Sequence, residues 1–431
     1  MAADDRVLSP PYRTVVKPYG QALAGLARQR PEIVCLSGDL TRQCEIDLFQ
    51  AEFGDRFIHA GMAEANMIGV AGALARSGLI PFVHTFGVFA TRRPLDQIVN
   101  AVAYPRLPVR IVGFMPGVSS PGGPSHQAIE DVALMRALPG MTVVDVADAT
   151  ETAQVVAAIA DVPGPVYLRL KRGEIPVIFP AGHRLSLDRA QILSDSGTSG
   201  GAETSGGGVT SGGGVTSGGA VSTGGADSSG GGVTSGGGVT TGGADSSGGG
   251  VTSGGGVTDG GGATSGGGVM AGGGVTTGGG VTGGGPECEI ALFASGMMIA
   301  PALAAAQVLR TAGISTVVVN VPVIKPLDTA TVLAVAARAG TVITAENHSI
   351  IGGLGSAVAE ALAEAALPRP LHRVGLADTF AEGAQSARYL FQKYGLTTDH
   401  LIQAAWQALH RPGTPPRSPT LEVAEGEYAP V

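Results

Sequence analysis

A glycine-rich repeat in the middle of this 431-residue chain limits how much of the chain can build an ordered core. Of its 70 glycines, 42 lie between residues 197 and 285, where valine recurs at intervals of six or twelve residues and no aromatic residue occurs. Glycine loses the most backbone entropy on ordering, and one valine per repeat buries too little apolar surface to offset that loss. We therefore expect a flexible linker, and a β-solenoid with a six-residue period is the alternative interpretation.

The segments on both sides of the repeat alternate strand-like and helix-like patterns, which is typical of parallel sheets covered by helices. About 340 residues lie outside the repeat, enough for two cores. We expect an α/β fold with parallel-sheet domains over residues 1–190 and 287–431, a linker over 191–286, and a disordered tail from about residue 412. The expected strands are 32–36, 110–114, 142–146, 165–170, 289–294, 316–321 and 341–345, and the expected helices are 63–76, 150–160, 301–312, 329–338, 352–365 and 398–409.

Charge and cysteine content exclude several classes of protein. The net charge is −8 and no basic cluster is present, so we do not expect a nucleic-acid partner. Three cysteines form no paired spacing, which favours a reduced, cytoplasmic setting over a disulfide framework. The first residues lack the apolar run of a signal peptide, and the longest apolar stretch, 297–309, is too short to span a membrane.

The residue types that carry chemistry are concentrated in a few short motifs of the first half. Gly61-Met-Ala-Glu-Ala-Asn places Glu64 in the first turn of a predicted apolar helix, where an acidic residue alone would serve only the helix dipole. Further along come Pro81-Phe-Val-His-Thr-Phe-Gly-Val-Phe, Gly122-Gly-Pro-Ser-His-Gln-Ala-Ile-Glu-Asp and Val166-Tyr-Leu-Arg-Leu-Lys-Arg-Gly. Each motif is modest by itself, whereas four in this order and spacing are specific.

In that order the motifs resemble the half of the transketolase family that holds the pyrimidine-binding and C-terminal domains. The similarity runs from about residue 12 to 179 and resumes from 289 to 409. It implies thiamine diphosphate as the cofactor. The cofactor supplies the difficult chemistry in such enzymes, and the protein supplies geometry and an acid–base group.

The resemblance assigns roles around the cofactor to five residues. Glu64 falls on the family glutamate that hydrogen-bonds the aminopyrimidine ring, a role for which its carboxyl must be partly dry and able to hold a proton near neutral pH. Phe86 and Phe89 fall on aromatics that flank this ring, although Phe-x-x-Phe also suits core packing. Met62 falls on the bulky residue that bends the cofactor. Asp39 falls on an aspartate near the cofactor, or else it only ends a strand.

The resemblance also places substrate contacts, and here the chain departs from the family. His126 falls on a histidine that lines the substrate entrance and assists proton transfer, and Arg172 falls on an arginine for the substrate phosphate. A loop hydrogen bond and a solvated charge are their plain alternatives. Four positions differ from the family: Gly122 replaces an aspartate, Phe114 a histidine, Val16 an arginine and Gln43 a serine. The candidates to replace the lost phosphate contacts are Lys17, Arg42 and Arg92.

One family element is missing from the chain. Thiamine enzymes hold the diphosphate through Mg²⁺ with Gly-Asp-Gly and a later Asn. Gly38-Asp39 with Asn66 has the spacing, but Leu40 stands in place of the second glycine. We therefore expect no metal ligands here. The resemblance implies that an N-terminal transketolase subunit carries the Mg²⁺ site, in an α2β2 assembly. His348 and the Gly-Gly-Leu-Gly run 352–355 also match the family, and we expect a tight strand-to-helix turn and a subunit contact there.

These observations predict the C-terminal subunit of a two-chain transketolase that transfers a two-carbon ketol unit between sugars or sugar phosphates. A related split thiamine enzyme is the nearest alternative, either similar to deoxyxylulose-phosphate synthase or a 2-oxo acid dehydrogenase β chain. A non-catalytic scaffold that uses the repeat for interaction is the alternative from another class. The donor and acceptor sugars stay open because four substrate contacts differ.

The linker interpretation predicts that the repeat can be exchanged without loss. Replacing residues 197–285 by a short Gly/Ser linker should leave the melting temperature and assembly of the chain unchanged, since the segment contributes no core. Differential scanning calorimetry and gel filtration of both chains provide the measurement. A melting temperature lowered by several degrees, or loss of an assembly, would support the solenoid or the scaffold instead.

Overall fold

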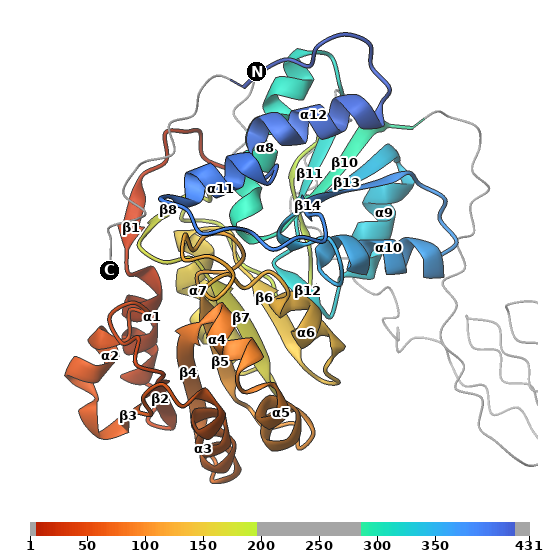
Figure 1. The fold of residues 1–431 in the computed structure, drawn as a ribbon. Helices are drawn as coiled ribbons and strands as arrows, with labels where there is room; N and C mark the ends of the chain where they lie inside the picture. The colour runs from red at the N-terminus through yellow and green to blue at the C-terminus, as the bar shows by residue number, and fades with distance from the viewer. Residues whose placement is uncertain (1–5, 196–285, 419–431) are drawn as a thin grey trace, which may run out of the picture. The chain divides into compact units, whose positions relative to one another are not determined.

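The computed structural model describes residues 6–195 and 286–418, so both interpretations of the repeat concern residues outside these ranges. The described residues hold one seven-stranded and one five-stranded sheet, each with helices packed against it (Figure 1). Both sheets are parallel except for one edge strand. The expected α/β class with two mainly parallel sheets is therefore confirmed.

The seven-stranded sheet is built from apolar strands that are buried on both faces, as parallel sheets require. Cys35 and Val112 point to the face covered by α1 (Pro18–Ala27) and α7 (Ala149–Ala160). Their neighbours Leu36 and Ile111 point to the face of α3 (Glu64–Arg76) and α6 (Asp131–Ala137). In spatial order the strands are β12 (Val323–Lys325), β6 (Thr142–Asp145), β7 (Val166–Leu170), β5 (Arg110–Phe114), β4 (Ile80–Phe86), β2 (Ile33–Ser37) and β3 (Phe57–His59).

The helices of this first half follow the strands in alternation. Asp148 begins α7 by accepting a hydrogen bond from the Glu151 amide at 2.8 Å, which satisfies one of the free amides of the first turn. The helices are α1 (Pro18–Ala27), α2 (Asp47–Glu52), α3 (Glu64–Arg76), α4 (Gly87–Arg92), α5 (Leu95–Gln97), α6 (Asp131–Ala137) and α7 (Ala149–Ala160), with a 3₁₀ turn at Gly54–Arg56 and a π-helical segment at Ile98–Ala103. A small ribbon pairs β1 (Thr14–Val16) with β8 (Glu174–Pro176).

The five-stranded sheet is packed between two pairs of helices: α8 (Ile299–Thr311) and α12 (Thr398–Ala408) on one face, and α9 (Thr329–Ala337) and α10 (Leu354–Glu364) on the other. Its strands, in spatial order, are β14 (Leu371–Leu376), β13 (Ala339–Ser349), β10 (Cys288–Ala294), β11 (Thr316–Asn320) and β9 (Gln191–Ser194). Its helices are α8 (Ile299–Thr311), α9 (Thr329–Ala337), α10 (Leu354–Glu364), α11 (Ala387–Lys393) and α12 (Thr398–Ala408), with a 3₁₀ turn at Gly296–Met298. None of the helices in the described ranges is both long and apolar enough to cross a lipid bilayer.

Each sheet takes its antiparallel edge strand from the other half of the chain. β9 precedes the repeat but pairs with β11, and β12 follows the repeat but pairs with β6. β9 thus lies inside the range that the sequence predicts as linker. At the other end, residues 412–418 are described although a disordered tail was expected from about 412, and Ser418 donates two hydrogen bonds to Asp399.

A buried ionic cluster joins the two halves. Arg169, whose side chain is 1% exposed, lies 2.8 Å from both Asp131 and Asp145. From the second half, the backbone oxygen of Asn347 accepts from Arg169 at 3.0 Å, and the Ser295 hydroxyl donates to Asp145 at 3.0 Å. Charges withdrawn from water in this way are tolerated only when each is paired and hydrogen-bonded.

This cluster predicts a large cost when its cation is removed. Arg169→Met should destabilise the chain by about 3–5 kcal/mol, because it leaves two buried carboxylates without a counter-charge. Arg28→Met, which removes an exposed ion pair with Glu52, should leave the urea midpoint unchanged. Urea titrations of both variants give the comparison, and equal midpoints for the two would contradict the role of the cluster.

Candidate functional site

Glu64 is a buried carboxylate at the start of a helix. It is the first residue of α3, and its side chain is 2% exposed. The Arg93 guanidinium donates to Glu64 Oε1 at 2.6 Å and is itself 45% exposed. The helix N-terminus and the arginine both favour a negative charge here. The buried carboxylate is therefore paired with an arginine side chain that reaches the protein surface.

Two phenylalanines form an apolar wall next to this ion pair. Phe86 ends β4 and Phe89 lies in the first turn of α4, with ring centroids 6.0 Å apart and planes inclined by 20°. The Arg93 guanidinium carbon lies 3.9 Å from the centroid of the Phe89 ring, a cation–π contact. Arg93 therefore contacts the carboxylate and the aromatic wall at the same time, and the two lie within the span of one side chain.

His126 contacts the same wall from a turn between β5 and α6. Its ring meets the Phe89 ring edge-on, with centroids 5.3 Å apart, and its Nδ1 lies 2.9 Å from the Ser125 hydroxyl. A Cβ atom on Gly122 would lie 2.8 Å from the Cβ of His126. The glycine that departs from the family aspartate is therefore required by this turn, since any larger residue would displace the histidine.

The other predicted site residues lie outside this cluster. Met62 is 77% exposed, two residues before Glu64. Asp39 has a left-handed backbone with φ of 70° and pairs with His59 at 3.2 Å, both side chains being about half exposed. Arg172 follows β7. Burial raises the pKa of the nearby Cys44 thiol, and the positive charge of Arg172 partly offsets that rise.

Of the cations that were candidates for phosphate contacts, two are engaged in ion pairs. Lys17 binds Asp47 at 2.6 Å, and Arg92 binds Glu130. Arg42 is exposed. Within residues 6–195 and 286–418, no group of three or more histidine, cysteine, aspartate or glutamate side chains is arranged to hold a metal ion.

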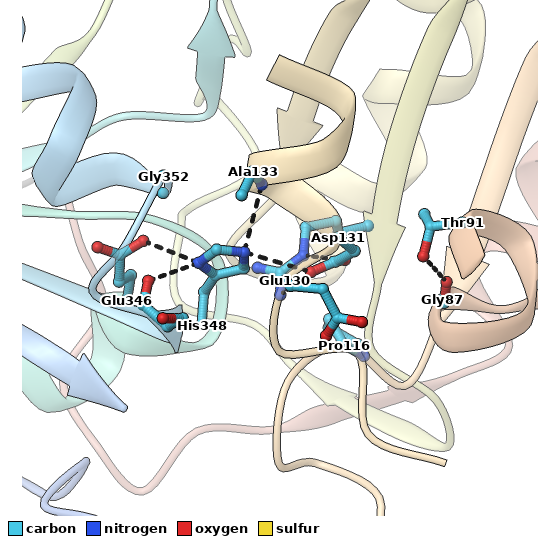
Figure 2. Close-up of polar contacts among 12 residues, drawn as sticks. Gly87, Thr91, Pro116, Glu130, Asp131, Ala133, Glu346, His348 and Gly352 are labelled. Carbon is cyan, nitrogen blue, oxygen red and sulfur yellow. Dashed lines mark hydrogen bonds and ion pairs between the residues drawn. The ribbon is translucent and has the colours of Figure 1, made fainter. Parts of the chain in front are cut away.

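His348 lies in a second polar cluster, between β13 and α6 (Figure 2). Its Nδ1 donates to the Ser349 oxygen at 2.6 Å and its Nε2 accepts from the Ala133 amide at 3.4 Å, a pattern that requires the neutral ring. Burial lowers the pKa of His348 to about 4, in agreement. Burial also raises the pKa of Glu346, 3.6 Å away, to about 7.

The glycine run after His348 forms the tight strand-to-helix turn that the sequence predicts. Glu346 accepts from the Leu354 and Gly355 amides at 2.7 and 2.9 Å and so begins α10. Gly352 has φ of 79°, and a Cβ there would lie 2.5 Å from the Cβ of Ala133 on α6. The turn thus packs against the other half of the same chain.

The sequence analysis missed Arg93, which belongs to the cluster, and His59, which pairs with Asp39 outside it. Arg93 could have been found from its spacing, because it follows Phe89 by four residues and that interval places two side chains on one helical face. His59 ends β3, a strand of three residues that was not predicted. Its contact with Asp39 depends on β2 and β3 being neighbours, which the pattern of a single strand does not reveal.

The residues present suit one end of thiamine diphosphate. A buried carboxylate beside an apolar aromatic wall can hydrogen-bond a heteroaromatic ring and exclude water from it, which matches the pyrimidine. The Mg²⁺ that holds a diphosphate needs acidic and amide ligands, and the sequence lacks the motif that supplies them. The chain therefore fits the pyrimidine half of a site.

Comparison with known proteins shows the family of this chain. Residues 12–177 match the transketolase pyrimidine-binding domain and residues 284–401 match the transketolase C-terminal domain. An uncharacterized transketolase family protein of Sinorhizobium fredii is 34% identical over 388 residues, which cover 89% of this chain and 86% of that protein. A 6-deoxy-6-sulfo-D-fructose transketolase subunit of a Clostridium species is 32% identical, with 91% and 94% covered.

Solved structures and more distant relatives extend the comparison. A split-gene transketolase, described as an inactive β4 tetramer, superposes with a TM-score of 0.64 at 32% identity and covers 93% of this chain and 99% of that one. A 1-deoxy-D-xylulose-5-phosphate synthase of a Synechococcus species is 26% identical over 412 residues, but these make up 49% of the synthase. The chain thus spans nearly the whole of a separate subunit and about half of a one-chain enzyme.

Proposed function

Because this chain belongs to the transketolase family, we propose that it is the C-terminal subunit of a two-chain, thiamine diphosphate-dependent transketolase. The proposal depends chiefly on the buried Glu64 carboxylate, which Arg93 connects to Phe89 and through it to His126, in a chain without a diphosphate motif. Its length supports the same conclusion, since it covers 94% of a transketolase subunit and 99% of a split-gene transketolase chain.

Each residue of the cluster has a proposed task. Thiamine diphosphate, when bound beside these residues, would supply the nucleophilic carbon for transfer of a two-carbon unit. Glu64 hydrogen-bonds the pyrimidine ring and holds the proton that is exchanged there. Phe86 and Phe89 exclude water from the ring. Arg93 covers the carboxylate in this structure, so it must share Glu64 or withdraw when the ring binds.

The substrate side is proposed on the same basis. His126 moves a proton at the substrate, since histidine is the side chain most often used to transfer protons in enzymes. Arg172 binds an anionic group of the sugar, and Met62 and Asp39 border the cofactor. One relative is named for a sulfo-sugar, so a sulfonate joins phosphate among the groups that Arg172 would meet. Mg²⁺ and the diphosphate are assigned to the partner, in an assembly with two copies of each chain.

The alternatives differ in what the complex would turn over. A synthase-like enzyme would require pyruvate as donor, and the similarity to deoxyxylulose-phosphate synthases keeps this class open. A dehydrogenase β chain would act on 2-oxo acids. A scaffold would have no turnover with any donor. The buried Glu64 carboxylate argues against this class, because a scaffold would have no need of it. Transketolase is favoured because relatives of matching length carry that name.

The split-enzyme proposal predicts that cofactor binding needs the partner. Calorimetry with thiamine diphosphate and Mg²⁺ should detect weak or no binding to this chain alone and tight binding to the pair co-expressed with the Gly-Asp-Gly-bearing polypeptide. The dense anion of the diphosphate is otherwise left without its metal. Tight, Mg²⁺-dependent binding by the isolated chain would contradict the proposal.

The role of Glu64 predicts a separate kinetic effect. In the reconstituted pair, Glu64→Gln should lower turnover by at least about 10²-fold, the usual scale for a general acid, because the amide cannot exchange the proton. Circular dichroism should show an unchanged fold. Glu52→Gln, an exposed glutamate on α2, is the matched control and should retain the parent rate. A Glu64→Gln variant as fast as this control would remove the residue from the mechanism.

A further inference from the structure

Arg92 encloses the turn that carries His126. Its guanidinium donates to the Pro124 oxygen at 2.7 Å and to the Gln127 oxygen at 3.0 Å, one on each side of the histidine. The same group forms a two-point ion pair with Glu130, where the turn meets α6. A planar arginine fork can hold several acceptors in fixed directions, which a lysine cannot do.

The helix that carries Arg92 also carries the ring that His126 contacts. Phe89 and Arg92 are three residues apart on α4, so their side chains share one face. The imidazole lies edge-on to Phe89, while its neighbouring carbonyls are held by Arg92. The same helix therefore positions both the turn and the Phe89 ring that the histidine contacts.

The far side of the turn is held by the second half of the chain. The buried Gln127 amide donates to the Ser120 and Glu382 oxygens, both at 3.0 Å. Glu130 lies beside His348 in the second polar cluster (Figure 2). Both ends of the turn are therefore held by contacts with the second half, and Arg92 connects the turn to the aromatic wall of the candidate site.

We infer that Arg92 is a positioning residue that fixes the His126 imidazole against Phe89 for proton transfer to the substrate. This rests on the proposed function for the role of His126, but the placement itself does not. Arg92 is half-buried and its donors are directed to Glu130 and two backbone oxygens, so it acts through the turn and not by binding substrate. A shift of about 1 Å in a reacting group can lower a rate by about 10²-fold, so a loose turn would be costly.

The test uses the full chain labelled at histidine and phenylalanine, with His126 assigned by loss of its signal in His126→Gln. In the parent, NMR should show cross-relaxation between the His126 and Phe89 rings. Arg92→Ala should lose it and raise amide exchange at residues 125–128 on the order of tenfold, as expected for two lost hydrogen bonds. Arg92→Lys keeps the charge opposite Glu130 but should behave like alanine, because an ammonium cannot hold both carbonyls.

Arg136→Ala is the matched control. Arg136 makes the same kinds of contact elsewhere, donating to the Gly352 oxygen at 2.8 Å and pairing with Glu360 at 2.7 Å. It should leave the His126 signals unchanged. An Arg92→Ala chain with parent-like cross-relaxation and exchange would overturn the inference.

Kinetics of the reconstituted pair test the consequence. Arg92→Ala should lower kcat on the order of 10²-fold and leave KM nearly unchanged, since the substrate contacts stay in place. A normal kcat in a variant whose turn has loosened would also overturn the inference. If the parent pair has no transketolase activity, the proposed function fails, while the NMR result still decides whether Arg92 positions His126.

Discussion

The buried charge of Arg169 is the constraint on which the arrangement of this chain depends. A guanidinium without water needs carboxylates on more than one side, and these come from Asp131 at the start of α6 and Asp145 at the end of β6. The Asn347 oxygen completes its shell from the other sheet. Because a buried charge is costly unless all its partners are present, these contacts connect the two sheets, and the Gln127 amide next to His126 adds another contact to the second half.

The regular elements could be read from the sequence because their patterns are long and apolar. The strand expected over 110–114 is β5, and the helix expected over 63–76 is α3, shorter by one residue at its start. β4 was not recognised as a strand because Pro81, His84 and Thr85 interrupt its apolar run. His84 is accommodated in the core by hydrogen bonds to Tyr19 and to the Leu36 oxygen, which no local pattern indicates.

Part of the candidate site was predictable because short motifs of the sequence match those of a family. The resemblance to the transketolase family placed Glu64, Phe89 and His126 in one site. In the structure Arg93 contacts both Glu64 and Phe89, and Phe89 contacts His126. The spacing of Arg93 from Phe89 predicts that their side chains share one helical face, but the contact of Arg93 with Glu64 depends on how α3 and α4 pack, which spacing does not indicate. The same limit applies to Gln127, whose partner at Glu382 is 255 residues away.

The exchanged edge strands bear on what would follow if the backbone were cut. β9 ends and β10 begins at the same end of β11, separated across the sheet by two strand spacings, or roughly 10 Å. A proteolytic nick between Ser194 and Cys288 would therefore leave two fragments that each complete the other's sheet. The two fragments would stay associated under native conditions and separate only on denaturation. The pairing of the strands does not depend on the length of the connection between β9 and β10.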